Sequence, residues 1–208
     1  MNTSDTIALV KQIAKTIEEH KEYLTELDTA IGDADHGINL SRGFSAVSTK
    51  LDAPFATPGE VLKATAMTLI STVGGASGPL YGTLFLKMSG ILTADEISLT
   101  DFCAGLEVGI EGVKARGKSA QGEKTMLDVL IPVLASLKES AVADLPGKEA
   151  FDKAVDVAKE SCEFTKTIIA TKGRASYLGE RSLGHIDPGS MSSYLMLKTT
   201  ADFLGGAQ

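Results

Sequence analysis

Three aspartates, Asp28, Asp33 and Asp35, fall within eight residues. Carboxylate oxygens are hard ligands that suit Mg²⁺ or Ca²⁺, and three like charges this close repel one another unless a cation lies among them. The spacing does not fit a calcium EF-hand, because the fifth position counted from Asp33 is Gly37 and the twelfth is Phe44. The pattern therefore favours a magnesium site, for which Mn²⁺ would also serve, over a solvated acidic turn.

A second candidate site is the sequence Gly-Gly-Ala-Ser-Gly-Pro at positions 74–79, which precedes a predicted helix. Small residues followed by a helix N-terminus bind anions, because free backbone N–H groups point outward and the helix dipole favours negative charge. The Ser77 hydroxyl would add a donor. A tight corner between two helices would need the same glycines, so the pattern alone leaves both interpretations open.

Residues 112–119 match the P-loop expression GxxxxGK[ST]. A P-loop requires a strand before it and a helix after it. Residues 99–112 have the pattern of a helix, and residues 120–123 would make a poor helix interior. We interpret the match as a coincidence, although Gly117 could contact a ligand where a helix ends.

Residues 172–190 form a long connection for a helical bundle, where two to eight residues are usual. The segment carries two arginines, a lysine and a histidine in an acidic protein. Arg174 or Arg181 could neutralise phosphate charge or pair with surface carboxylates. The sequence Asp187-Pro188-Gly189 is also an ordinary turn signal.

No nucleophile is evident in the sequence. There is no GxSxG motif, and Cys103 and Cys162 lie in helical patterns that predict burial. His36 and His185 lie in candidate site loops, where either could contact a ligand or cap a backbone group.

Helical periodicity dominates the elements that must position these residues. The first helix, capped by Thr3 or Ser4, extends to about Leu27 on apolar residues spaced mostly three or four apart. The other helices are expected at residues 39–51, 61–73, 79–93, 100–116, 125–140, 148–171 and 190–204. Strand patterns are few and no linker divides the chain. We therefore expect one domain over residues 1–208, an all-α antiparallel bundle or barrel of eight helices.

The composition excludes several classes of protein. The chain has 208 residues, 43% of them hydrophobic, and a net charge of −7, which argues against disorder and against nucleic-acid binding. Two distant cysteines argue against a disulfide framework and a zinc site. No apolar run is long enough to span a membrane, and the N-terminus does not have the pattern of a signal peptide. We expect a soluble, cytoplasmic protein.

Taken together, the loops contain the sequences GDADHG, GGASGPLYGT, GEKTM, KGRASYLGERS and GHIDPGS. This combination closely resembles the nucleotide-binding (L) subunits of bacterial dihydroxyacetone kinases of the phosphotransferase-system-dependent type. The resemblance implies an eight-helix barrel with ADP or ATP tightly bound at one end. It also implies two Mg²⁺ ions that bridge the phosphates to Asp28, Asp33 and Asp35, which would be catalytic together with Arg174.

The resemblance further implies a set of residues that contact the nucleotide. These are His36, Gly37, Ile38, Asn39, Ala76, Ser77, Gly117, Met126, Arg174, Asp187, Pro188 and Gly189.

The partners implied by the resemblance are a K subunit and an M subunit. The K subunit would hold dihydroxyacetone covalently on a histidine of its own, and a phosphohistidine of the M subunit would phosphorylate the bound ADP. We therefore expect the present chain to lack an acceptor domain and to supply the phosphoryl group; a homodimer is also expected. Three alternatives remain: an L-type subunit acting on another acceptor, a nucleotide-loaded regulatory module, and a metal-stabilised bundle.

Overall fold

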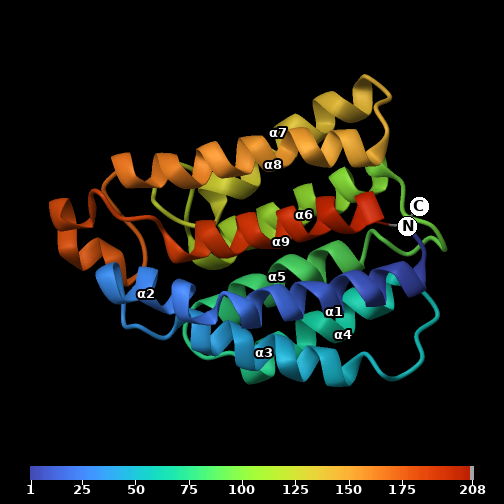
Figure 1. Cartoon of the computed structure of the whole chain (residues 1–208), viewed down its shortest axis with the longest axis horizontal. Helices are drawn as coiled ribbons and strands as arrows, with labels where there is room; N and C mark the ends of the chain where they lie inside the picture. The colour runs from blue at the N-terminus through green and yellow to red at the C-terminus, as the bar shows by residue number, and fades with distance from the viewer. Residues whose placement is uncertain (207–208) are drawn as a thin grey trace.

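The computed structural model describes residues 1–206 and contains helices but no strand over that range (Figure 1). The α-helices are α1 (Thr3–Glu19), α2 (Lys21–Ile31), α3 (His36–Lys50), α4 (Pro58–Thr72), α5 (Ser77–Ser89), α6 (Leu99–Gly117), α7 (Leu127–Val142), α8 (Gly147–Phe164) and α9 (Pro188–Gly206). Two 3₁₀ helices, η1 (Thr165–Thr167) and η2 (Arg174–Ser182), lie between α8 and α9. The all-α prediction is confirmed.

Eight of these helices form a closed ring. From α3 to α9 each helix packs against the next one along the chain, and α1 closes the ring by contacting both α3 and α9. Helix α2 lies at one end of the ring, between α1 and α3 in the chain (Figure 1). Connections at alternate ends make neighbouring helices antiparallel, as a barrel of this kind requires. These connections are short except between α8 and α9, where residues 165–187 intervene.

The first predicted helix is divided in two at His20, which corrects the sequence prediction. His20 has φ −105° and ψ 13°, and its Nδ1 lies 2.8 Å from the carbonyl oxygen of Thr16. The apolar pattern has no member between Ile17 and Leu24, so nothing on that turn holds the chain against the core. The cap is Asn2 rather than Thr3 or Ser4: its side chain accepts the N–H of Asp5.

Three other boundaries differ from the prediction in ways that affect the site. Helix α3 begins at His36, so its first turn includes residues predicted as loop, and α5 begins at Ser77. Helix α8 ends at Phe164 instead of continuing to residue 171, because Thr165 turns the chain into η1. The long connection 172–190 contains the 3₁₀ helix η2.

The core of the barrel is continuous and apolar. Phe44 and Phe85 meet edge to face with their ring centroids 6.5 Å apart, and Cys103 and Cys162 are both buried, as predicted. Helix α5 packs closely on α4, since a Cβ atom on Gly82 would lie 2.3 Å from Cγ1 of Ile70. Within residues 1–206 we find no helix that is both long and apolar enough to cross a membrane.

Candidate functional site

A cavity of about 420 Å³ opens where the ends of α2, α5, α6 and α9 meet the loop before α7 and the start of η2. Its walls come from segments of the chain that are far apart in the sequence. The predicted site residues that line it are Asp28, Asp33, Asp35, His36, Ala76, Ser77, Gly117, Met126, Arg174, Asp187, Pro188 and Gly189.

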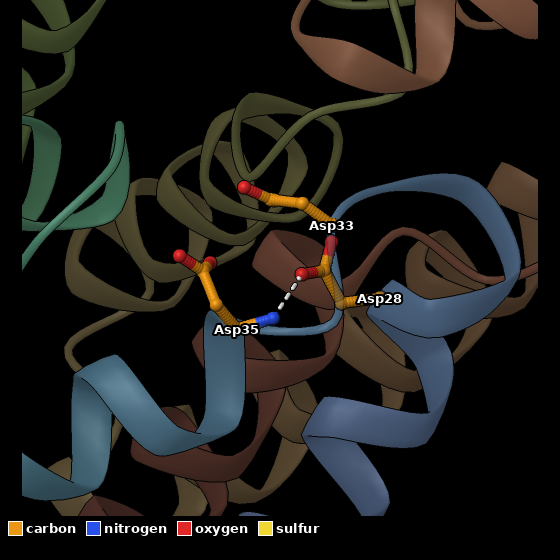
Figure 2. A group of neighbouring side chains, drawn as sticks. All are labelled: Asp28, Asp33 and Asp35. Atoms are coloured by element: carbon orange, nitrogen blue, oxygen red, sulfur yellow. Dashed lines mark hydrogen bonds between the residues drawn. The ribbon is translucent and has the colours of Figure 1, made fainter.

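The three aspartates converge in this cavity. One carboxylate oxygen of each lies within 4.8 Å of the others (Figure 2). Asp28 lies in the last turn of α2, and its Oδ2 accepts the backbone N–H groups of Asp35 (2.9 Å) and His36 (3.2 Å). Ala34 adopts a left-handed φ of 62°, which folds the chain back between Asp33 and Asp35. A cluster of hard oxygen donors at this spacing fits Mg²⁺.

The charges around the cluster favour a bound cation. Burial and the negative charge of Asp33 raise the pKa of Asp35, and the hydrogen bond with Asn39 partly opposes this. A divalent cation would relieve this repulsion. The guanidinium Nε of Arg174 lies 2.9 Å from Oδ2 of Asp33, so the site already contains one side-chain cation beside the carboxylates.

The N-terminus of α5 lies next to the aspartates. No side chain caps this helix, which leaves its first backbone N–H groups without a side-chain acceptor. An ideal Cβ on Gly75, just before the helix, would lie 3.9 Å from Oδ1 of Asp35. A phosphate group bound at this helix end would therefore be adjacent to a metal ion held by the aspartates.

Gly37, Ile38 and Asn39 belong to the first two turns of α3 and do not line the cavity. Gly37 packs against α2, where a Cβ would lie 2.1 Å from the carbonyl oxygen of Lys21. The side chain of Ile38 is exposed. Asn39 is buried and accepts a hydrogen bond from Arg42 Nη2 at 2.7 Å. The structure thus places these residues around the aspartate loop and outside the cavity.

A buried hydrogen-bond network ties the first turns of α3 and α9 to α5. The Tyr81 hydroxyl lies 2.7 Å from Ser192 Oγ and 3.1 Å from the carbonyl oxygen of Gly189. Ser192 Oγ in turn lies 2.9 Å from His36 Nε2. Burial lowers the pKa of His36 to about 4, so this imidazole is neutral at pH 7. Tyr81 was not predicted as a site residue, because a tyrosine in a helical pattern is usually interpreted as a core residue.

Asp187 is the residue that caps α9. Its Oδ2 accepts the backbone N–H of Ser190 at 2.6 Å, and its own N–H donates to Thr165 Oγ1 at 3.1 Å. Burial is the largest cause of the shift in the pKa of Asp187, and it raises that pKa to about 7. The Asp-Pro-Gly turn signal is therefore a helix start that also forms part of the cavity wall.

Lys124 is a second cavity residue that sequence reasoning missed. Its side chain is 1% exposed, whereas a lysine in a glycine-rich loop is expected on the surface. Burial lowers its pKa, and the charges of Asp187 and Asp128 oppose this change. The only signal in the sequence was its place within the GEKTM motif.

The apparent P-loop is a coincidence, as predicted. Gly112 is buried in the interior of α6, no strand precedes it in the part of the chain that the structure describes, and Lys118 ends the helix in a left-handed conformation. Gly117, the last residue of α6, lines the cavity.

Comparison with known proteins identifies the class of protein. The model of the DAK2 domain matches residues 30–202, and the chain belongs to this family. It is 47% identical over 182 residues to the ADP-binding subunit DhaL of the PEP-dependent dihydroxyacetone kinase of Escherichia coli, covering 86% of this chain and 87% of that one. It is 44% identical over 191 residues to the corresponding subunit of kinase 1 of Listeria innocua, covering 90% and 89%.

Longer proteins contain a related segment. Human triokinase/FMN cyclase is 34% identical over 208 residues, which cover 98% of this chain and 36% of that protein. The crystal structure of the dihydroxyacetone kinase of C. freundii matches with a TM-score of 0.75 at 21% identity, over 97% of this chain and 35% of that one. A structure of that kinase with AMP-PNP and Mg²⁺ matches with a TM-score of 0.73. At this identity the likeness concerns the fold.

Proposed function

We propose that this chain is the ADP-binding subunit of a phosphoenolpyruvate-dependent dihydroxyacetone kinase. In this relay, a phosphohistidine of an M subunit phosphorylates ADP bound here, and the γ-phosphoryl group passes to dihydroxyacetone held by a K subunit. The observation that carries the proposal is the convergence of Asp28, Asp33 and Asp35 beside the uncapped N-terminus of α5. The names and 44–47% identities of the bacterial relatives support it.

The aspartates would hold the metal ions, which we propose to be two Mg²⁺. When bound, Mg²⁺ supplies positive charge and Lewis acidity to the phosphate oxygens. Asp28 is fixed for this role by the two backbone N–H groups that its carboxylate accepts. Arg174 pairs with Asp33 and is placed to stabilise negative charge that develops on a transferred phosphoryl group.

The rest of the cavity suits the nucleoside. The cavity lining also has an apolar part, which is formed by Leu80, Val113, Met126 and Pro188. Apolar walls with a few placed polar groups are typical of cofactor sites. We therefore propose that the diphosphate lies at the aspartates and the α5 N-terminus, and that the base and ribose lie toward Met126 and Pro188.

The same geometry supports tight retention of the nucleotide. A metal ion held by three carboxylates and by the diphosphate would have to lose several bonds before the nucleotide left. We propose that ADP stays bound through many cycles as a cofactor. We place this reaction in the cytoplasm.

Reconstitution tests this function. The chain loaded with one equivalent of ADP is mixed with phosphorylated M subunit and with K subunit carrying dihydroxyacetone, and dihydroxyacetone phosphate is measured. We expect many turnovers per bound ADP, with no free ATP detectable. Product formed only when free ATP is consumed in equal amounts would contradict the relay, and no product at all would contradict the proposed function.

A further inference from the structure

Lys124 buries its ammonium group, and within residues 1–206 no carboxylate forms an ion pair with it. Nζ donates to the carbonyl oxygens of Thr165 (2.6 Å) and His185 (2.6 Å), and it lies 3.4 Å from that of Ile168. A buried charge is costly unless its hydrogen-bonding capacity is satisfied, and here three backbone carbonyls satisfy it. The cation therefore joins the loop before α7 to two segments between α8 and α9.

The hydrogen bonds continue from Lys124 in a closed circuit. Thr165 Oγ1 accepts the N–H of Asp187 (3.1 Å), and Asp187 Oδ2 accepts the N–H of Ser190 (2.6 Å). Ser190 Oγ donates to the carbonyl oxygen of Thr125 at 2.8 Å, which returns the circuit to the residue after Lys124. Thr165 and Ser190 are completely buried. We call these five residues, Lys124, Thr125, Thr165, Asp187 and Ser190, the clasp.

The clasp fixes one wall of the cavity. Met126 follows it directly in one segment, and Pro188 and Gly189 lie inside it in the other. The two segments approach closely, since a Cβ on Gly189 would lie 3.4 Å from the backbone nitrogen of Met126. The distance between them sets the width of the part of the cavity assigned above to the nucleoside.

We propose that Lys124 is a positioning residue for the nucleoside half of the nucleotide. Its ammonium group holds Met126 against Pro188 and Gly189, so that this wall is formed before the ligand arrives. This inference rests on the proposed function, which supplies the identity of the ligand. The hydrogen-bond circuit is present in the structure whether or not that function is correct. Preformed walls favour binding because less ordering is required when the ligand enters.

The position of the clasp predicts a difference between two ligands. Mg²⁺-pyrophosphate occupies only the region of the aspartates and α5, whereas Mg²⁺-ADP also requires the wall behind Met126. Lys124→Met keeps most of the side-chain volume and removes the three donors. By calorimetric titration we expect ADP to bind about tenfold more weakly or worse, with pyrophosphate affinity unchanged. Lys124→Arg, which keeps a cation with several donors, is expected to recover part of the loss.

A milder variant keeps the test valid if Lys124→Met does not fold. Thr165→Val removes the hydroxyl that accepts the Asp187 N–H and keeps the shape of the side chain. Thr65→Val is the matched control, because Thr65 is equally buried but bonds only within α4, to the carbonyl of Val61. We expect faster amide exchange at Asp187 and weaker ADP binding in Thr165→Val, and neither change in the control.

The outcomes separate this inference from the proposed function. Equal weakening of pyrophosphate and ADP, or ADP binding that is unchanged in both clasp variants, would overturn the positioning role while leaving the nucleotide site intact. A wild-type protein that binds neither ligand would overturn the proposed function, and the positioning role with it.

Discussion

Asp33 is the aspartate whose role is most easily tested, because it is exposed to the cavity and pairs with Arg174. Replacing it with asparagine removes one of three anionic ligands without changing the shape of the loop. We expect Asp33→Asn to lose Mg²⁺-dependent ADP binding and to keep the helical circular dichroism of the wild type. Asp52→Asn is the control, since Asp52 forms an exposed pair with Lys11 far from the cavity. Full transfer activity in Asp33→Asn would contradict the assignment.

The raised pKa of Asp187 predicts how the free energy of unfolding depends on pH. Its pKa is about 7 in the folded protein, raised by burial from an ordinary value of 3.8. Between these values the unfolded chain has released the proton that the folded chain keeps, so stability falls as the pH rises through this interval. The free energy of unfolding of the wild type, minus that of Asp187→Asn, should therefore fall by about 3 kcal/mol from pH 4 to pH 7.

Urea unfolding in the presence of a chelator measures this difference. Subtracting the variant removes the contributions of other groups, including that of His36, whose lowered pKa has the opposite effect. The difference is expected to level off above about pH 8. A difference that stays constant from pH 4 to pH 8 would show that Asp187 titrates normally.

The residues that the sequence could predict were those with a recognisable spacing. Three aspartates within eight residues favour a metal site because their like charges repel one another unless a cation lies among them. Lys124 and Tyr81 carry no such pattern, since their importance comes from partners 40 to 110 positions away. Only the closed barrel reveals them.

At the scale of elements, the contact between α2 and α3 positions the aspartate loop. Gly37 allows α3 to approach α2, where a Cβ would meet the Lys21 carbonyl at 2.1 Å and Thr25 Oγ1 at 2.5 Å. Gly37→Ala must separate the two helices, and we expect it to cost about 1–3 kcal/mol of stability and to weaken ADP binding. Gly147→Ala at the start of α8 meets nothing within 4 Å and is expected to be neutral or slightly stabilising. Chemical denaturation of both variants compares them directly.

Hydrophobic periodicity predicted where the helices lie, but it did not predict where several of them begin or end. The helix predicted at residues 61–73 follows the sequence Thr-Pro-Gly-Glu, which is a strong start signal. In the structure α4 begins at Pro58, and Thr57 Oγ1 accepts the N–H of Glu60. The break at His20 and the early start of α3 carry no comparable signal. They depend on how α2 folds over the end of the barrel, which is a tertiary effect.

For the whole molecule, the ring closes between α1 and α9, two helices at opposite ends of the described chain. This closure brings residues 28–36, 75–81, 113–126 and 172–189 around one cavity. Periodicity predicts the helices and their antiparallel order. It does not give their neighbours across the ring, and the family resemblance was needed to place the loops at a common end.

We propose that this cavity holds a nucleotide through metal ions on the three aspartates. The most direct measurement is to purify the protein without added nucleotide, denature it, and identify any small molecule released. We predict near-stoichiometric ADP that survives dialysis with Mg²⁺ and is lost on treatment with a chelator. An empty protein that binds neither ADP nor ATP in the presence of Mg²⁺ would contradict the account.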